Sequence, residues 1–319
     1  MQQSVSVAEQ EPEVCRGSVP DFSVVIVCRN NKVYLEPCLE SLYRGNVRTR
    51  FDVVVVDNGS SDGTPTMVRD SFPRVQLIQN DHNAGLSAAT NQGISATRGR
   101  YVLLLNDDTI VNATSLDSLV QYLEDHPEVA GVGGKLLNAD GTVQSCYNRF
   151  STLREEFLVA TRLGELFREG YPATTKDNER RVVDWIGSAC LMLRRSALDE
   201  VGLLDEEYFI YGDEADLQYR LNQAGWQICY IPHASTVHYG GRSMNRWSRR
   251  KMVYRGKLLF YRKNYGAVRT TTLRLMFGAL SVLKMLFWSF ALAVRPWRRR
   301  AVKELRSNRD VVEVCRCLS

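Results

Sequence analysis

The chain has 319 residues, of which 44% are hydrophobic and 24% are charged, and its formal net charge is +5. This balance is typical of globular proteins and excludes a largely disordered chain. The length allows one large domain, alone or with an appendage. The eight cysteines form no pair of Cys-x-x-Cys clusters, which argues against a structural zinc site.

The first segment, residues 1–20, is polar and carries no periodic pattern, so we expect a flexible leader there. It lacks the basic and then apolar layout of a secretory signal peptide. Together with the scattered cysteines, this favours a reducing, cytoplasmic setting.

Apolar segments then alternate with helical patterns. The continuous apolar runs indicate parallel strands buried on both faces, and they lie at Phe22–Val27, Phe51–Val56, Val75–Ile78 and Tyr101–Leu105. Helical patterns lie at about Tyr34–Leu42, Leu86–Ala96 and Ser115–Asp125, and a further strand is expected at Val129–Val132. The strand, helix, strand order predicts right-handed crossovers and an α/β fold.

An acidic pair ends the strand at Tyr101–Leu105, in the run Asn106-Asp107-Asp108. Charges are costly to remove from water, so two acids at the mouth of a buried strand favour a bound cation. Mg²⁺ and Mn²⁺ suit such oxygen ligands, and substrate phosphates often complete their shell. The alternative is a polar turn that caps the next helix.

Two polar loops follow other strands. Asp57 begins a Gly-rich turn that runs to Thr64, at a strand end where α/β proteins bind ligands, and it could accept a hydrogen bond from a base. The segment Asn80–Gly93 leads into a helix whose free N-terminus can favour phosphate oxygens, although ordinary capping by Asn83 is an alternative. The dinucleotide fingerprint and the P-loop motif are both absent.

Aromatic residues precede the acids Asp213, Glu214 and Asp216, and such an apolar wall can raise a carboxylate pKa. Acids in the first turn of a helix are favourable in any case, and Arg220 is spaced to pair with Asp216. His238 precedes a glycine pair and is a better ligand candidate than His233, which we expect to be structural.

Taken together, the chain resembles the family 2 inverting glycosyltransferases of GT-A fold, and most of all the bacterial rhamnosyltransferases of surface-polysaccharide assembly. The resemblance runs from about Phe22 to Gly266 and rests on the ordered motifs Val24–Asn30, Asp57–Thr64, Asn80–Gly93, Asn106–Asp108, Trp185–Cys190, Asp213–Arg220, His238–Ser243 and Tyr261–Gly266. It implies a Rossmann-like mixed sheet flanked by helices, over residues 21–245.

The resemblance also implies residue roles. The nucleotide sugar would be bound by Arg29, Asn30, Asp57, Gly59, Asn83, Gly85, Asn91 and Asp107. The acceptor would be bound by Trp185, Gly187 and Asp216, and a Mg²⁺ or Mn²⁺ ion by Asp108 and His238. The family motif has an acid where this chain has Asn106, which removes one charge.

For the general base, the family order of the two acids is reversed in Asp213-Glu214, and by position we favour Glu214. The donor expected from the resemblance is thymidine diphosphate rhamnose, with a uridine diphosphate hexose or galactofuranose as alternatives. The acceptor is expected to be a glycan or a lipid-linked glycan. Rival interpretations are a nucleotidyltransferase and a catalytically silent membrane scaffold of the same fold.

Residues 246–319 form a basic helical tail in which Leu275–Val294 is almost wholly apolar, with Lys284 near its centre. Because both flanks are basic, we expect this helix or hairpin to lie in the membrane surface, at the cytoplasmic face of the inner membrane, as a peripheral or monotopic anchor. The alternative is a tail buried in an oligomer. The apolar run argues against nucleic acid as the partner of the basic residues.

Overall fold

The computed structural model describes residues 19–164, 179–240, 246–293 and 297–317. The predicted leader therefore lies outside these ranges, except for residues 19 and 20.

One large sheet forms the centre of the molecule, in the strand order β3-β2-β1-β4-β11-β6-β12-β5. Its first half is parallel and comprises β1 (Phe22–Cys28), β2 (Phe51–Asn58), β3 (Gln76–Asn80) and β4 (Tyr101–Asn106). The continuous apolar runs of β1, β2 and β4 are buried, as expected for inner parallel strands. The predicted α/β fold is thus confirmed.

The second half of the sheet is mixed. It comprises β11 (Cys190–Arg194), β6 (Val129–Leu137), β12 (Gln227–His238) and β5 (Thr109–Val111), with β7 (Val143–Gln144) and β9 (Arg181–Val183) at its margins. β11 runs antiparallel to β4, and β12 runs parallel to β6 but antiparallel to β5. The last of these pairings sets His238 opposite Thr109, next to the acidic pair.

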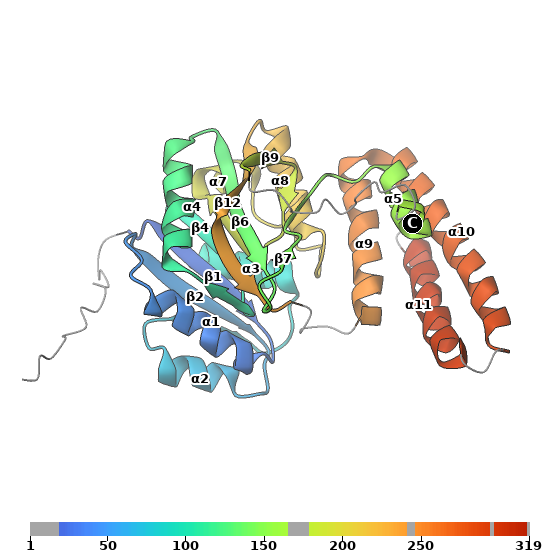
Figure 1. The fold of residues 1–319 in the computed structure, drawn as a ribbon, viewed down its shortest axis with the longest axis horizontal. Helices are drawn as coiled ribbons and strands as arrows, with labels where there is room; N and C mark the ends of the chain where they lie inside the picture. The colour runs from blue at the N-terminus through green and yellow to red at the C-terminus, as the bar shows by residue number, and fades with distance from the viewer. Residues whose placement is uncertain (1–18, 165–178, 241–245, 294–296, 318–319) are drawn as a thin grey trace, which may run out of the picture.

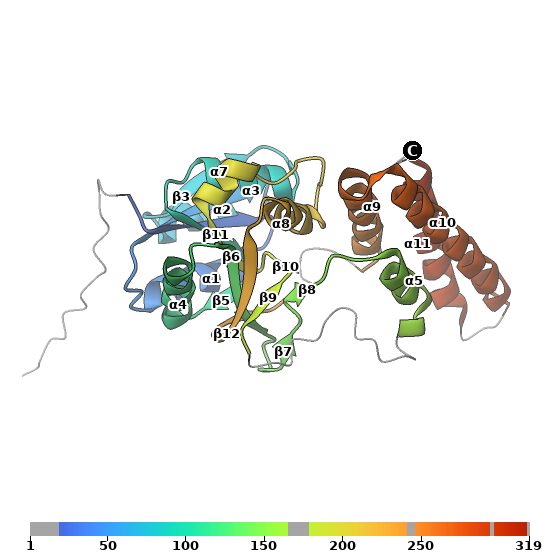
Figure 2. The ribbon, with the colours of Figure 1, turned by 90° about the horizontal axis from the view of Figure 1, so that it is seen from above.

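Helices cover both faces of the sheet, with α3, α7 and α8 on one side and α1 and α4 on the other (Figure 2). Their bounds are α1 (Lys32–Arg44), α2 (Thr64–Ser71), α3 (Leu86–Ser95), α4 (Ala113–Asp125), α7 (Arg195–Val201) and α8 (Asp213–Gln223). A small second sheet pairs β8 (Tyr147–Asn148) with β10 (Trp185–Ile186).

A second hydrophobic core lies beside the sheet, in a bundle of four helices (Figure 1). They are α5 (Leu153–Thr161), α9 (Arg246–Asn264), α10 (Gly266–Ala291) and α11 (Arg298–Cys317). Tyr261, Leu273, Phe277 and Val311 are buried at its centre. α5, from the middle of the chain, completes the core that the C-terminal helices form.

α10 has two different faces. Leu273 and Phe277 pack inward, whereas Leu275 and Phe290 are 65% and 80% exposed. Lys284 does not lie on the exposed apolar face, since its Nζ donates a hydrogen bond to the carbonyl oxygen of Ala160 at 2.6 Å. In length and composition α10 could cross a membrane, and it is alone in this among the described helices.

Candidate active site

Asp57 is fully buried at the end of β2 and has one oxygen without a partner. Its Oδ2 accepts a hydrogen bond from the backbone N–H of Ser60 at 3.1 Å. Its Oδ1 accepts none from any described residue. A buried acceptor left unpaired costs free energy, so this oxygen is ready to accept an N–H from a ligand.

The turn after β1 is tied to the turn after β2. Asn30 has a φ of +51°, and its Oδ1 accepts a hydrogen bond from the backbone of Ser61 at 2.7 Å. Its own N–H donates to Ser60 Oγ at 2.9 Å. Arg29 is exposed beside it. The two turns therefore form one polar rim above the carboxyl ends of β1 and β2.

Two glycines allow loops to approach each other closely. Gly85 has a φ of +92°, and a Cβ there would lie 2.9 Å from the ring of Phe209. Gly59 has a φ of +77°, and a Cβ there would lie 2.9 Å from the backbone of His82. Asn83 fixes this rim, because its Oδ1 accepts hydrogen bonds from Gly85 N and from a neighbouring asparagine amide.

The N-terminus of α3 differs from the expectation of a free phosphate site. The first amide of the helix, on Leu86, already donates to the carbonyl oxygen of Phe209 at 2.7 Å. The hydroxyl of Ser87 donates to the carbonyl oxygen of Tyr208 at 2.6 Å. The loop that precedes the acidic helix α8 therefore covers this helix end.

Asn91 does not face the rim. Its amide nitrogen donates to the carbonyl oxygen of Leu204 at 2.8 Å and to Glu206, and its oxygen accepts the N–H of Leu204. All of its polar atoms are engaged by this loop, so we revise its role from contacting the nucleotide sugar to positioning the loop.

Asp108 and His238 lie together at the opposite end of the rim. The Oδ1 of Asp108 is 3.2 Å from the Nε2 of His238. The other ring nitrogen, Nδ1, is 2.7 Å from the Oε1 of Gln144. Because Gln144 Nε2 donates to Asn138 and to the carbonyl oxygen of His238, its Oε1 must accept. The proton of a neutral His238 is therefore on Nδ1, and its Nε2 carries a lone pair.

This arrangement fits a divalent cation. A lone pair and a carboxylate oxygen only 3.2 Å apart repel each other unless a proton or a cation lies between them. Neighbouring ligands of an octahedral ion at about 2.1 Å are themselves about 3 Å apart. The amide of Asn106 is 3.3 Å from Nε2, a long hydrogen bond that a cation would replace.

The protein supplies few ligands of its own here. In the described part of the chain, no group of three or more His, Cys, Asp or Glu side chains forms a metal site. Asp108 and His238 are therefore two ligands of an incomplete shell. Such a shell is typical of Mg²⁺ or Mn²⁺ sites that substrate phosphates and water complete.

Asp107 has a different environment from its neighbour. It is 8% exposed, and burial raises its pKa to about 6, with the charge of Asp108 acting in the same direction. Its carboxyl also has Cys28 as a hydrogen-bonding neighbour, which opposes that rise. Asp107 therefore holds a charge at neutral pH at some cost in free energy.

Asp213 and Glu214 begin α8 behind a strained turn. Tyr211 has a φ of +66°, unusual for an aromatic residue, and Gly212 has a φ of +99°. Burial raises the pKa of Glu214 well above its ordinary value, and the charge of Asp213 and a hydrogen bond between the two carboxyls raise it further. Glu214 is therefore held in its protonated form more strongly than an exposed glutamate.

Asp213 points toward the strand ends. It lines a cavity of about 30 Å³ together with Asn106 and Ser188. Its Oδ2 lies 3.1 Å from the hydroxyl of Ser87, whereas its Oδ1 is buried with no partner among the described residues. The structure thus brings this acid close to the residue that precedes Asp107-Asp108.

Two residues expected to bind the acceptor, Trp185 and Gly187, make hydrogen bonds to backbone carbonyl groups of the segment 146–149. The indole of Trp185 donates to the carbonyl oxygen of Arg149 at 3.1 Å. The backbone of Gly187 donates to Cys146, and a Cβ there would meet only open space and one carbonyl. Gln218, which sequence reasoning missed, ties the intervening Ile186 to α8 by two hydrogen bonds of 2.8 Å.

Asp216 differs from the expectation of acceptor binding. Its Oδ1 accepts hydrogen bonds from Tyr208 and from Asn264, and its Oδ2 accepts one from Arg220 at 3.0 Å. Both oxygens are buried and engaged. We therefore revise its role to joining α8 to α9, while the predicted pairing with Arg220 is confirmed.

Known proteins share this sequence and fold. Residues 20–254 match the glycosyltransferase like family 2. An N-acetylglucosaminyl-diphospho-decaprenol L-rhamnosyltransferase of Mycobacterium tuberculosis is 31% identical over 239 residues, which cover 70% of this chain and 77% of that protein. The low-salt glycan biosynthesis hexosyltransferase Agl10 of Haloferax volcanii is 25% identical over 289 residues, which cover 86% and 88%.

A solved structure extends the likeness to the fold. The mannosyltransferase PcManGT of Pyrobaculum calidifontis, solved in complex with GDP-Man and Mn²⁺, matches with a TM-score of 0.55 at 16% identity. The match covers 92% of this chain and 86% of that one. At this identity the likeness concerns the fold.

Proposed function

Since the chain belongs to the glycosyltransferase like family 2 and is a glycosyltransferase of GT-A fold, we propose that it transfers rhamnose from thymidine diphosphate rhamnose to a lipid-linked glycan. The observation that carries the metal-dependent part is the 3.2 Å contact between Asp108 Oδ1 and His238 Nε2. The named activity of the mycobacterial relative supports rhamnose and a diphosphate-linked lipid acceptor.

In this proposal the donor lies along the carboxyl ends of β1, β2 and β4. The unpaired Oδ1 of Asp57 accepts a hydrogen bond from the base, and the rim of Arg29, Asn30, Gly59, Asn83 and Gly85 encloses the nucleoside. Asp107 contacts the ribose or the cation. A Mg²⁺ or Mn²⁺ ion held by Asp108 and His238 would supply positive charge to the departing diphosphate.

The acceptor hydroxyl loses its proton to the acidic pair at the start of α8. We assign the base to Glu214, because a carboxylate with a raised pKa accepts a proton better at neutral pH than an ordinary one. Asp213 keeps that pKa high through its charge. Trp185 and Gly187 border the acceptor. The oxygen then attacks the anomeric carbon from the face opposite the diphosphate, and the configuration inverts.

A donor screen tests this proposal. Purified protein with Mn²⁺ and a membrane extract should release nucleoside diphosphate from thymidine diphosphate rhamnose, and much more slowly from uridine diphosphate hexoses or galactofuranose. Faster release from one of these donors would contradict rhamnose and leave glycosyl transfer in place. No release from any of them would favour the silent scaffold of the same fold.

We also propose that the protein binds the cytoplasmic face of the inner membrane through α10. Its exposed side chains Leu275, Leu286, Phe287 and Phe290 form an apolar face on a basic bundle, which is the pattern of an interfacial helix. The Leu286→Ser/Phe290→Ser variant should lose sedimentation with phosphatidylglycerol vesicles while keeping its melting temperature. Unchanged sedimentation would contradict this assignment.

A further inference from the structure

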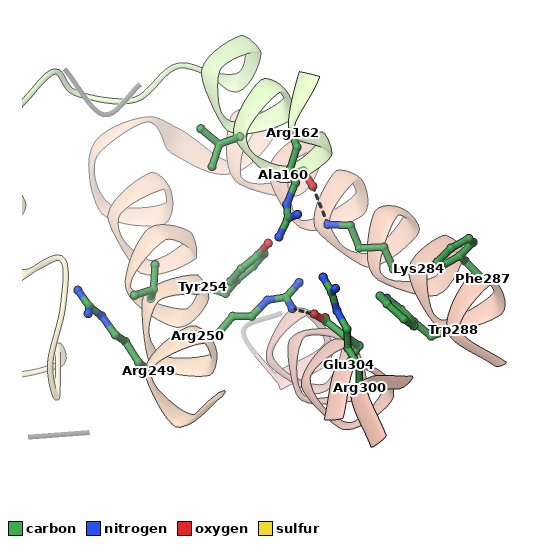
Figure 3. A pocket seen from close by; sticks show the side chains of 12 residues that line it. Ala160, Arg162, Arg249, Arg250, Tyr254, Lys284, Phe287, Trp288, Arg300 and Glu304 are labelled. Atoms are coloured by element: carbon green, nitrogen blue, oxygen red, sulfur yellow. Dashed lines mark hydrogen bonds and ion pairs between the residues drawn. The ribbon is translucent and has the colours of Figure 1, made fainter. Parts of the chain in front are cut away.

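A second cavity, of about 620 Å³, lies within the helical bundle between α5, α9, α10 and α11 (Figure 3). Five cationic side chains line it, against a single carboxylate, namely Arg162, Arg249, Arg250, Lys284 and Arg300 against Glu304. None of these residues belongs to the site described above. We call this space the basic cavity.

Most of this positive charge is not neutralised within the described structure. Arg250 pairs with Glu304 at 3.3 Å and also donates to Asn308. Arg162 and Arg300 have no carboxylate partner among the described residues, and Arg300 lies 5.4 Å from the ring centre of Trp288. Like charges held close together repel each other, so an anion that enters this space gains free energy.

Two local features point into the same space. Arg162 ends α5 in the left-handed region, with a φ of +62°, and its guanidinium is directed into the basic cavity (Figure 3). The ammonium of Lys284 enters from α10. Burial lowers the pKa of Lys284, and the charges of Arg250 and Arg162 lower it further. These cations are close enough to act on one ligand.

One residue of the basic cavity also contacts the loop that precedes the acids of α8. Arg249 lines the basic cavity and also stacks at 5.6 Å over the ring of Tyr211, two residues before Asp213. In Figure 3 it points to the side of α9 away from the other guanidinium groups. α9 therefore lies between the basic cavity and this loop, and Arg249 is the lining residue that contacts the loop.

On its other side the basic cavity opens onto the apolar face of α10. Phe287 lines the basic cavity and is 56% exposed, and Leu286 and Phe290 lie next to it on the exposed face. A ligand with an anionic head and a hydrocarbon chain is complementary to a cationic cavity that lies next to an apolar helix face. The head would meet arginines, and the chain would lie along α10.

We propose that the basic cavity binds the diphosphate of the lipid-linked acceptor, with its hydrocarbon chain on α10. This inference rests on the proposed function. A diphosphate is favoured over the phosphodiester of a membrane phospholipid because it carries more negative charge. Guanidinium groups also bind its adjacent phosphate oxygens in pairs.

The experiment compares two double variants of the full chain that remove the same charge. Arg162→Gln/Arg300→Gln removes the two cations of the basic cavity that lack carboxylate partners. Arg255→Gln/Arg299→Gln removes two exposed cations of α9 and α11 that do not line it. Calorimetry in detergent measures binding of farnesyl diphosphate, farnesol and inorganic diphosphate. Binding of dTDP and UDP with Mn²⁺ is measured on the same samples.

The proposal predicts that the first variant binds farnesyl diphosphate at least about tenfold more weakly than the wild type, whereas the second is unchanged. Equal binding by both variants would overturn it. Inorganic diphosphate bound as tightly as farnesyl diphosphate would show a site for free phosphate instead. Cavity-dependent binding of phosphatidylglycerol vesicles, without binding of farnesyl diphosphate, would show a phospholipid site instead.

The nucleotide arm separates this inference from the proposed function. If the first variant keeps dTDP or UDP binding and loses farnesyl diphosphate binding, both proposals stand. If the wild type binds neither nucleotide with Mn²⁺, the proposed function fails, and with it the identification of the ligand as an acceptor.

Discussion

Asp107 and Asp108 are neighbours in the chain, yet they have different partners. Asp108 lies against His238, whereas Asp107 is buried with its pKa raised to about 6. Sequence reasoning placed both acids at a cation, and it selected His238 from a glycine-flanked motif. It missed Gln144, which fixes the tautomer of His238 from a segment without any periodic signal.

The raised pKa of Asp107 predicts that its carboxylate lowers the free energy of unfolding at neutral pH, although the proposed function needs that carboxylate. Above pH 6 the folded protein must ionise a buried carboxyl that the unfolded chain ionises freely. The Asp107→Asn variant should therefore gain about 1–3 kcal/mol of unfolding free energy at pH 7.5, and this gain should shrink as the pH falls from about 6 to about 4.

Urea unfolding of the metal-free wild type and variant across this pH range measures the difference. The control is Asp70→Asn, at an exposed acid near the end of α2. A variant that is less stable than the wild type at pH 7.5 would mean that the Asp107 carboxylate stabilises the fold.

The acidic pair of α8 gives a prediction that separates its two members. Glu214→Gln should lower kcat/KM by about 10²–10⁴-fold, because it removes the base. Asp213→Asn should keep measurable activity, and the acidic limb of its pH profile should move to lower pH. The reason is that the negative neighbour that raises the pKa of Glu214 is gone.

Rates measured from pH 5 to 9 decide between the two acids. If Asp213→Asn is inactive while Glu214→Gln keeps the wild-type rate, the base is Asp213. Its cavity beside Asn106 would then be the place where the acceptor hydroxyl lies.

Most elements were predictable from the sequence, because buried parallel strands and amphipathic helices leave strong periodic signals. The packing of α5 into the C-terminal bundle was not predictable. It depends on long-range contacts such as the ion pair between Glu156 and Lys257 and the hydrogen bond from Tyr261 to Ser151. The partners of Asn91 and Asp216 were not predictable for a related reason, since their motifs do not reveal which segments engage their oxygens.

Two glycines in the bundle give a matched pair of element-scale predictions. A Cβ on Gly256 of α9 would collide with the backbone carbonyl of Tyr211, whereas a Cβ on Gly278 of α10 would meet no neighbouring atoms. Gly256→Ala should therefore destabilise the protein by about 1–3 kcal/mol and lower transferase activity. Gly278→Ala should stabilise it by about 0.5–1 kcal/mol.

Chemical denaturation and a transfer assay on both variants measure these effects. The loss of activity in Gly256→Ala follows from displacement of the turn that holds Asp213. If both alanines had the same small effect, α9 would not be in firm contact with this turn.

At the scale of the whole molecule, the functional groups lie in two regions, the carboxyl ends of the strands and the helical bundle. The carboxyl ends of the strands gather the unpaired Asp57, the Asp108 and His238 pair, and the acids of α8. The helical bundle adds a basic cavity and an apolar face, and Arg249 of α9 links it to the loop that precedes these acids. The excess of positive charge in the C-terminal residues was predictable from the sequence. The position of five of the cationic side chains around one cavity was not, because it depends on the packing of α5 against three C-terminal helices.

The rate of nucleoside diphosphate release by the wild type and by Asp108→Asn, with Mn²⁺ and with EDTA, tests the central claim most directly. The wild type should be active with Mn²⁺ and lose at least about 100-fold in rate with EDTA, and Asp108→Asn should be equally slow in both. A wild type that keeps its full rate in EDTA, together with an Asp108→Asn variant as fast as the wild type, would contradict a metal-assisted transfer at this site.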